Sequence, residues 1–335
     1  MPYWLILATA FVLSSAVALA AVGALLPRLR AWQVVDVPNA RSSHTRITPR
    51  GGGLGILVTV LPGWLLAWWL AGDMPQSAAV VAAATLLAVI CWIDDVRTIG
   101  PGLRFGVQIV TVAVGLTALD SDQYVFGGYL PFFLDRVAAG ICWLWFINLF
   151  NFMDGIDGLA ATETIAVCVG VILLAFLYLG QPLLAVEAMI LAGAALGFLW
   201  WNWSPAKVFM GDVGSAPIGF LVGFLLMNLA AAGELAAALI LPMYFVADAT
   251  VTIFRRLGRG AKIWEPHREH AYQRAAQAGL SHRRVVGTVG VVNAAFVALA
   301  FASLYQPVAA LAAALLIVSV LLWYLSSRPA RRSGN

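Results

Sequence analysis

The sequence predicts an all-α protein that crosses a membrane ten or eleven times. Hydrophobic residues make up 62% of the 335 residues, charged residues only 11%, and the mean hydropathy is +0.89. A soluble globular protein of this length would need more polar surface than this composition supplies. The apolar residues also fall into separate runs, many of them close to the ~20 residues that cross a bilayer as a helix.

Eleven apolar runs are candidate spans. They cover residues 3–26, 52–71, 77–93, 105–119, 136–150, 159–179, 183–201, 216–232, 235–254, 285–304 and 308–325. Several are short for a hydrocarbon core of about 30 Å, which leaves the count at ten or eleven. The first run has Arg28 and Arg30 after it and no basic residue before it. That order is the reverse of a cleavable signal and favours a retained helix.

The Lys and Arg residues predict the orientation. Of the 20, all but Arg136 fall in the loops and the tail on one side of the predicted helices. The positive-inside rule makes that side cytoplasmic. We therefore expect one transmembrane domain, 1–335, with a large cytoplasmic loop at 256–284 and a basic tail at 326–335. The net charge of +4 suits phosphate-bearing ligands and anionic headgroups, although topology explains much of it.

The three cysteines, Cys91, Cys142 and Cys168, all lie inside apolar runs. This placement argues against a disulfide framework and against a thiolate metal site. We interpret them as small core residues.

Two carboxylates, Asp154 and Asp157, stand at the mouth of an apolar helix in the stretch 148–159. A carboxylate in hydrocarbon is costly unless it is paired, hydrated or bound to a cation, so this stretch is a candidate site. Gly155 and Gly158 flank Asp157 and allow the backbone to approach a ligand closely. If the segment is helical, the two acids share one face.

Four further polar segments fall on the same predicted side. They are the first loop with Gly51 to Gly53 behind Arg46 and Arg50, the adjacent acids Asp94 and Asp95, the stretch 202–215 with Asp212 between glycines, and the stretch 264–274 with His267 and His270. The triple glycine could offer backbone N–H groups to a phosphate. A single loop Asp or His is more often a solvated or capping group. The joint pattern, with all four histidines on this side, predicts an active site.

The carboxylates and histidines together could suggest zinc. However, the carboxylates outnumber the imidazoles, and no close His pair recurs with a third ligand. Hard oxygen ligands are more typical of Mg²⁺ that holds a diphosphate.

These motifs, in this order from Asp36 to Gln273, resemble the polyprenyl-phosphate N-acetylhexosamine-1-phosphate transferases. Those membrane enzymes move a sugar 1-phosphate from a UDP-sugar onto a lipid phosphate and release UMP. The resemblance implies a UDP-N-acetylhexosamine and undecaprenyl phosphate as substrates, Mg²⁺ (or Mn²⁺) as cofactor, membrane lipids but no nucleic acid as partners, and a place in the bacterial inner membrane with the active site facing the cytoplasm. The resemblance is also compatible with a homodimer.

The resemblance also implies roles for individual residues. The catalytic set is Asp94, Asp95, Asp154, Asp157, His267, Arg268 and His270. The substrate-binding set is His44, Arg50, Gly52, Asn148, Asn151, Asn202 and Phe209, with Phe209 stacking on uracil. Asp212 and Asn148 would hold the metal ion.

Two departures separate the chain from the peptidoglycan branch of that family. Thr98 stands where that branch has a lysine, and His267 and His270 are spaced where it has adjacent histidines. The pattern resembles the branch that starts O-antigen and other surface polysaccharides, for which N-acetylglucosamine and its 6-deoxy relatives are natural sugars. The muramyl-pentapeptide substrate of the peptidoglycan branch stays the alternative.

Two other kinds of protein, a transporter and a scaffold, are alternatives to an enzyme. An ion-coupled transporter would place acids near the bilayer midplane, where only Glu163, Glu187 and Asp248 could lie. A non-catalytic scaffold would leave the acid cluster unexplained.

Overall fold

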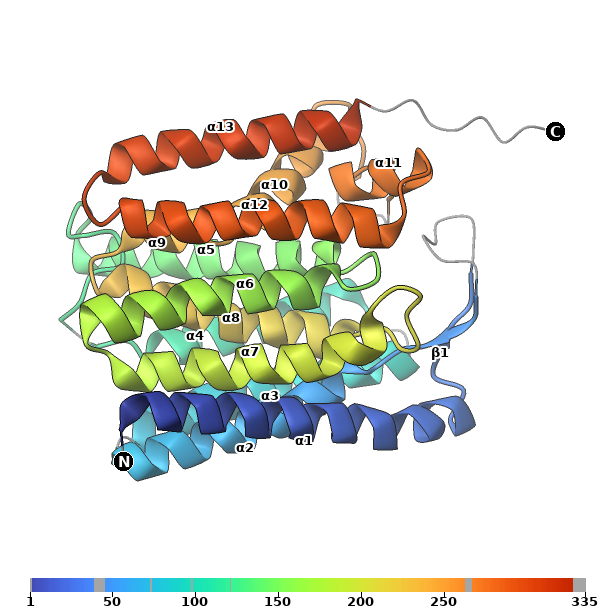
Figure 1. Cartoon of the computed structure of the whole chain (residues 1–335), viewed down its shortest axis with the longest axis horizontal. Helices are drawn as coiled ribbons and strands as arrows, with labels where there is room; N and C mark the ends of the chain where they lie inside the picture. The colour runs from blue at the N-terminus through green and yellow to red at the C-terminus, as the bar shows by residue number, and fades with distance from the viewer. Residues whose placement is uncertain are drawn as a thin grey trace.

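The computed structural model describes residues 2–38, 46–72, 74–97, 99–120, 122–262 and 267–327 as a bundle of helices that run side by side (Figure 1). The elements are α1 (Tyr3–Ala31), β1 (Val35–Asp36), β2 (Thr48–Pro49), α2 (Gly53–Ala71), α3 (Met74–Val96), α4 (Pro101–Leu116), α5 (Phe132–Met153), α6 (Leu159–Leu174), the π-helix η1 (Ala175–Leu179), α7 (Pro182–Asn202), α8 (Asp212–Ala231), α9 (Leu235–Ile240), α10 (Met243–Leu257), α11 (Ala271–Gln277), α12 (His282–Ala302) and α13 (Pro307–Ser326). β1 and β2 pair as a short antiparallel ribbon, with Val35 opposite Pro49.

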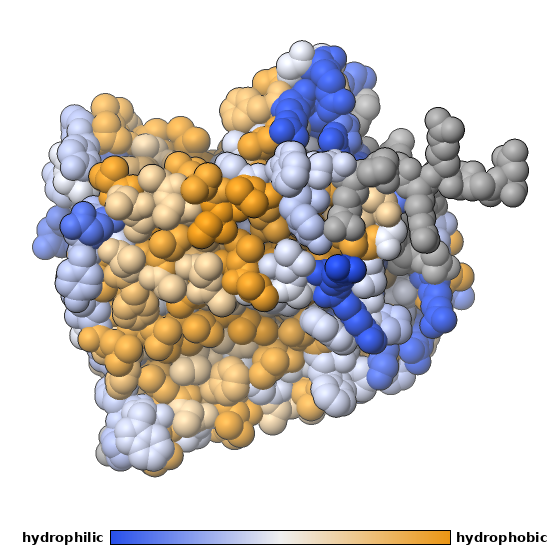
Figure 2. Space-filling view, turned by 45° about the horizontal axis from the view of Figure 1, so that its top comes forward, coloured by the Kyte–Doolittle hydropathy of each residue, from blue (hydrophilic) through white to orange (hydrophobic). Residues whose placement is uncertain are grey.

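Nine helices in the described part of the chain are long and apolar enough to cross a membrane. They are α1, α2, α3, α5, α6 together with η1, α7, α8, α12 and α13. Apolar side chains cover the middle of the face in Figure 2, and hydrophilic ones gather toward its ends. The prediction of an all-α membrane protein is confirmed.

Two predicted spans differ in form from the other nine. The run 105–119 corresponds to α4, whose 16 residues are fewer than the ~20 that cross a bilayer. The run 235–254 is divided between α9 and α10, because Pro242 lacks the N–H that would continue the helical ladder. The first span also continues beyond residue 26 to Ala31, since a helix can extend past charged residues into the interface.

Helix α8 lies at the centre of the bundle, with almost all of its side chains buried. Gly219 and Gly223 allow α5 to approach closely: a Cβ on Gly223 would come within 2.3 Å of Trp143 Nε1. The Trp143 ring instead stacks on Phe220, and its N–H donates to the Phe220 carbonyl at 3.0 Å. Within a membrane there is no hydrophobic driving force that brings helices together. Small residues that let helices approach closely are therefore the usual means of packing.

The same device joins α1 to α7. A Cβ on Gly193 would lie 2.1 Å from Ser14 Oγ, and one on Gly197 would lie 2.3 Å from the Ser15 carbonyl oxygen. Trp201 at the end of α7 donates to the Leu19 carbonyl at 3.0 Å. The two helices therefore lie in close contact, as Figure 1 also shows.

The cysteines divide between core and surface. Cys91 and Cys168 are buried, as predicted, but Cys142 is exposed, so the interpretation of all three as core residues is wrong for Cys142. α5 packs one face on α8, and Cys142 lies away from that buried face.

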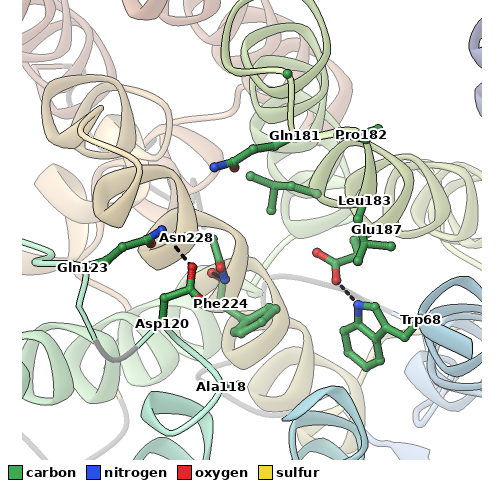
Figure 3. A pocket seen from close by; sticks show the side chains of 12 residues that line it. Trp68, Ala118, Asp120, Gln123, Gln181, Pro182, Leu183, Glu187, Phe224 and Asn228 are labelled. Carbon is green, nitrogen blue, oxygen red and sulfur yellow. Dashed lines mark hydrogen bonds between the residues drawn. The ribbon is translucent and has the colours of Figure 1, made fainter. Parts of the chain in front are cut away.

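A polar cavity of about 360 Å³ lies where α2, α4 and α8 end and α7 begins. In Figure 3, Trp68 Nε1 donates to the carboxylate of Glu187, and Gln123 donates to Asp120. Arg136, the single basic residue predicted on this side, donates to the Asp120 carbonyl. This end of the bundle lies opposite the five polar segments.

Candidate active site

The described parts of the five predicted polar segments meet at one end of the bundle, beside β1 and α11 in Figure 1. The first loop pairs with the α7–α8 loop: Gly52 N donates to Phe209 O and Gly53 N to Met210 O, both at 2.9 Å. The first turn of α8, which follows that loop, reaches the acid pair, because Val213 N donates to Asp95 Oδ2 at 3.0 Å.

The remaining two segments join the same network. Gly158 N donates to Asn202 Oδ1 at 2.8 Å, which ties the α5–α6 loop to the end of α7. Tyr272 Oη in α11 donates to the Phe152 carbonyl at 2.9 Å, which ties the last loop to the end of α5. Segments far apart in the sequence therefore form one continuous polar end.

The glycines of the first loop serve close packing between backbones. A Cβ on Gly53 would lie 2.2 Å from Gly214 Cα, and one on Gly52 would lie 2.8 Å from the Phe198 ring. Because the N–H groups of Gly52 and Gly53 already donate to protein carbonyls, the structure gives them a use other than the expected phosphate cradle. The predicted substrate role of Gly52 stays a prediction.

Two arginines hold the acids of α3 and α8. The Arg104 guanidinium at the start of α4 lies between Asp94 and Asp212, with Nη1 at 2.6 Å from Asp212 Oδ2 and also bonded to Asp94 Oδ2. Arg50 donates to the Asp95 carbonyl, and its Nη1 lies 3.7 Å from Asp95 Oδ1. No basic residue lies directly beside Asp212 in the sequence, and Arg104 reaches it from another helix.

Asp154 belongs to the same acid cluster. It caps the C-terminus of α5. Burial, followed by the negative charges of Asp212 and Asp95, raises the pKa of Asp154 well above its ordinary 3.8. Asp154 therefore lies close enough to Asp212 and Asp95 for their charges to disfavour its ionised form.

Asp157 turns toward a different partner. The segment between α5 and α6 is a loop, so the conditional expectation that Asp154 and Asp157 share a helix face is not met. Asp157 Oδ2 lies 3.2 Å from His282 Nδ1 and 3.2 Å from the Ala206 N–H. Burial raises the pKa of Asp157, but the hydrogen bond and charge of His282 together with the Ala206 N–H lower it below 3.8 overall.

The described part of the last polar segment, residues 267–274, is anchored by Asp248 of α10. Its carboxylate accepts from the N–H groups of Ala271 at 2.8 Å and Tyr272 at 3.4 Å, and so caps α11. His270 is buried with Nδ1 3.6 Å from Asp248 Oδ1. Burial and the neighbouring His270 lower the pKa of His267 to about 4, so this imidazole is neutral at neutral pH.

The other predicted residues lie around the same end. Asn148 donates to Gln108 Oε1 at 2.8 Å, and Asn202 also donates to the Val208 carbonyl at 2.9 Å. Asn151 lies half-buried in the last turn of α5. The backbones of Phe209 and Arg50 form an isolated parallel β-bridge. The Arg268 carbonyl accepts a hydrogen bond from the side chain of Gln277. His44 and Thr98 lie outside the described residues, as does most of the basic tail.

Three residues at this end were not assigned roles from the sequence. Arg104 and Asp248 each pair with a residue of another helix, and His282 pairs with Asp157 of the α5–α6 loop. A linear motif does not reveal contacts across such separations. The available signal was weak: Arg104 and Asp248 are charged residues at the margins of apolar runs.

The carboxylates around Asp212 provide some, but not all, of the ligands that a Mg²⁺ ion needs. No group of three or more His, Cys, Asp or Glu side chains among the described residues is arranged to hold a metal ion. Mg²⁺, however, usually takes only one or two protein carboxylates and completes its shell with water and substrate phosphates. The cluster around Asp212 supplies such carboxylates, and the charges of Asp212 and Asp95 add to burial in raising the pKa of Asp154.

A glycine at the centre of this end gives a direct test of its packing. A Cβ on Gly155 would lie 2.2 Å from Tyr272 Oη. Gly155→Ala is expected to displace Tyr272 and lower enzymatic activity by about 10- to 100-fold, the range that a shift of about 1 Å causes in an active site. Adding Tyr272→Phe should restore part of this loss, because the nearest remaining atom, Cζ, lies 3.1 Å away.

The matched control is Gly102→Ala in α4, where a Cβ meets nothing within 4 Å. Initial rates and melting temperatures would be compared for the four proteins. A Gly155→Ala enzyme with full activity, or a double variant no better than the single one, would contradict this packing.

Comparison with known proteins agrees with this architecture. Residues 77–230 match the family described as glycosyl transferase family 4. A Bacillus subtilis (strain 168) protein named "Probable undecaprenyl-phosphate N-acetylglucosaminyl 1-phosphate transferase" is 30% identical over 280 residues, covering 78% of this chain and 75% of its own. The decaprenyl-phosphate N-acetylglucosaminephosphotransferase of Mycolicibacterium smegmatis is 34% identical, covering 75% and 71%.

A phospho-N-acetylmuramoyl-pentapeptide-transferase of Mycobacterium sp. (strain JLS) is 30% identical, covering 67% of this chain and 76% of its own. The relatives therefore include proteins named as N-acetylglucosamine 1-phosphate transferases and one named as a phospho-N-acetylmuramoyl-pentapeptide-transferase. The identities and shared lengths show that the chain belongs to glycosyl transferase family 4, among the polyprenyl-phosphate hexosamine-1-phosphate transferases.

Proposed function

We propose that this protein transfers N-acetylglucosamine 1-phosphate, or a closely related N-acetylhexosamine 1-phosphate, from its UDP-sugar to undecaprenyl phosphate and releases UMP. The observation that carries the proposal is the arrangement of Asp94 and Asp212 around Arg104, with Asp95 and Asp154 beside them, at one end of a membrane-spanning bundle. The acceptor phosphate hangs from a lipid and the donor is water-soluble, so the reaction needs a site at the interface. The helix ends that carry these acids lie together at one end of the bundle, which supports such a placement (Figure 1).

Phosphoryl transfer depends on positioning and charge neutralisation more than on covalent chemistry by the protein. Arg104 can donate to the phosphates while Asp94 and Asp212 fix its orientation. A bound Mg²⁺ would neutralise the diphosphate charge, with Asp212 as its carboxylate and Asn148 as a candidate amide ligand. Phe209 would stack on the uracil ring.

The product is proposed to start O-antigen or another surface polysaccharide. The two relatives above that use N-acetylglucosamine support this sugar. The spacing of His267 and His270 favours the same branch over the pentapeptide branch. The pentapeptide transferase among the relatives keeps its substrate as the alternative to be tested.

The chemistry is proposed to take one step. A phosphate monoester has a second pKa of about 6, so the lipid phosphate is largely dianionic at neutral pH and is already a competent nucleophile. A covalent enzyme intermediate helps when it divides a difficult step, and that need is weak here. One lipid phosphate oxygen forms a bond to the sugar-bearing phosphorus as the bond to UMP breaks.

Isotope exchange checks this mechanism. Delipidated enzyme is expected to show no incorporation of labelled UMP into UDP-sugar until the lipid-diphosphate-sugar product is added. Exchange without any lipid would instead require a phospho-enzyme, with Asp94 or Asp95 as its nucleophile.

The activity itself is tested with purified protein, Mg²⁺, undecaprenyl phosphate and a panel of UDP-sugars, by following UMP release and the lipid product. UMP release with UDP-N-acetylglucosamine is expected. Release with only the UDP-muramyl-pentapeptide would assign the other branch. Cation flux in proteoliposomes without UMP release would favour a transporter, and neither activity would favour a scaffold.

A further inference from the structure

An apolar groove of about 730 Å³ runs along the close contact between α1 and α7, away from the acid cluster. Its walls are α1 residues between Phe11 and Leu19 and the last turns of α7. The acid cluster is built by α3, α4, α8 and the end of α5, none of which lines the groove. The groove is thus a separate feature of the surface that faces the membrane.

The groove ends at a cation and two tryptophans. Lys207, in the middle of the α7–α8 loop, lines this end, and its Nζ lies 5.2 Å above the Trp201 ring. Within the described residues, no carboxylate forms an ion pair with Lys207. Trp200 and Trp203 line the same end and are 70% and 41% exposed. Tryptophan is enriched at the level of lipid headgroups, and a lysine there attracts anionic lipid.

We propose that this groove binds one anionic phospholipid, with an acyl chain between α1 and α7 and its phosphate at Lys207. The apolar walls match a hydrocarbon chain, and the single cation at the polar end matches one phosphodiester charge. The occupant is a membrane phospholipid and not the acceptor lipid, because an acceptor phosphate must reach the acids around Arg104, which other helices hold.

The site has a structural consequence for the α7–α8 loop. Lys207 points outward from this loop, while Val208 beside it is buried and the Ala206 N–H binds Asp157. A phospholipid held at Lys207 would therefore brace the segment that positions Asp157 and Phe209.

Native mass spectrometry of the delipidated full-length protein would test the proposal, with phosphatidylglycerol and phosphatidylcholine of identical chains as probes. One phosphatidylglycerol is expected to bind in preference to phosphatidylcholine. Lys207→Gln should weaken this binding about fivefold, which corresponds to one surface lysine near an anionic lipid. Arg28→Gln, an exposed charge change on α1 outside the groove, should leave it unchanged.

A second pair of variants tests the apolar walls. Ala16→Trp fills the groove and should abolish the preferential binding, whereas Leu13→Trp, on an exposed α1 face outside it, should not. Both positions are exposed, so the fold should tolerate both changes. Equal loss in Lys207→Gln and Arg28→Gln, or equal binding of the two phospholipids, would overturn the proposal. One-for-one displacement by undecaprenyl phosphate would assign the groove to the acceptor lipid.

Hydrogen exchange measures the effect on the loop. Phosphatidylglycerol is expected to slow the exchange of residues 203–211 in the wild type but not in Lys207→Gln. Binding that leaves this exchange unchanged would remove the proposed link between the lipid and the loop.

Discussion

Arg104→Gln is expected to lower the turnover number by about 10³-fold, the effect of removing one charge-stabilising group from a phosphoryl-transfer site. Arg104 is the cation that reaches both Asp94 and Asp212, so its loss removes a donor to the phosphates and frees two carboxylates to repel them. Arg104→Lys keeps the charge but replaces the planar guanidinium, whose Nη1 contacts both acids, with a compact ammonium on a flexible stem, so it should recover only part of the activity. Steady-state UMP release would measure all three enzymes.

Arg97→Gln is the matched control, because Arg97 lies exposed in the same α3–α4 connection. It should keep wild-type turnover. Melting temperatures would separate a catalytic defect from unfolding, since removing Arg104 leaves Asp94 and Asp212 without their cation. An Arg104→Gln enzyme that folds normally and turns over at the wild-type rate would remove Arg104 from the site.

The sequence predicts the membrane fold well because hydrophobicity along a helix is a local property. Each of the eleven apolar runs is helical in the structure, and most boundaries agree within a few residues. The breaks are also local in origin: Pro242 interrupts the run 235–254, and a proline in an apolar run can be recognised without tertiary contacts. Helix ends are less predictable, because the α1 helix continues through residues that hydropathy excludes.

The candidate site is predictable only as a location. Successive spans cross the membrane in opposite directions, so counting them along the chain is enough to place the polar segments at the same end. The pairing of side chains depends on how helices rotate against one another, which the sequence does not state. The sequence therefore does not predict the contact of Arg104 with Asp212, and it groups Asp157 with Asp154 although the partner of Asp157 is His282 of α12.

Asp248 illustrates the same limit. From the sequence it is an acid near the end of an apolar run, consistent with a buried ion relay. In the structure it accepts hydrogen bonds from the first N–H groups of α11 and lies beside His270. Its burial is explained by capping an adjacent helix, which requires knowledge of where α11 folds back onto α10.

Asp212→Asn is expected to lower turnover by two or more orders of magnitude and to raise the Mg²⁺ concentration needed for half-maximal rate about tenfold or more. The substitution keeps the shape of the side chain and removes one anionic oxygen. Glu234→Gln, in the short loop before α9 at the opposite end of the bundle, is the control and should change neither quantity.

The Mg²⁺ titration separates two roles for Asp212. Asp212 Oδ2 accepts from Arg104 at 2.6 Å, so its loss could lower turnover merely by releasing that guanidinium. In that case Arg104→Gln and Asp212→Asn would give similar turnover with wild-type Mg²⁺ dependence, and the double variant would be little worse than either single one. A metal ligand instead predicts a raised Mg²⁺ requirement in Asp212→Asn alone. Unchanged Mg²⁺ dependence in that variant would exclude Asp212 as a ligand and leave it as a positioning residue for Arg104.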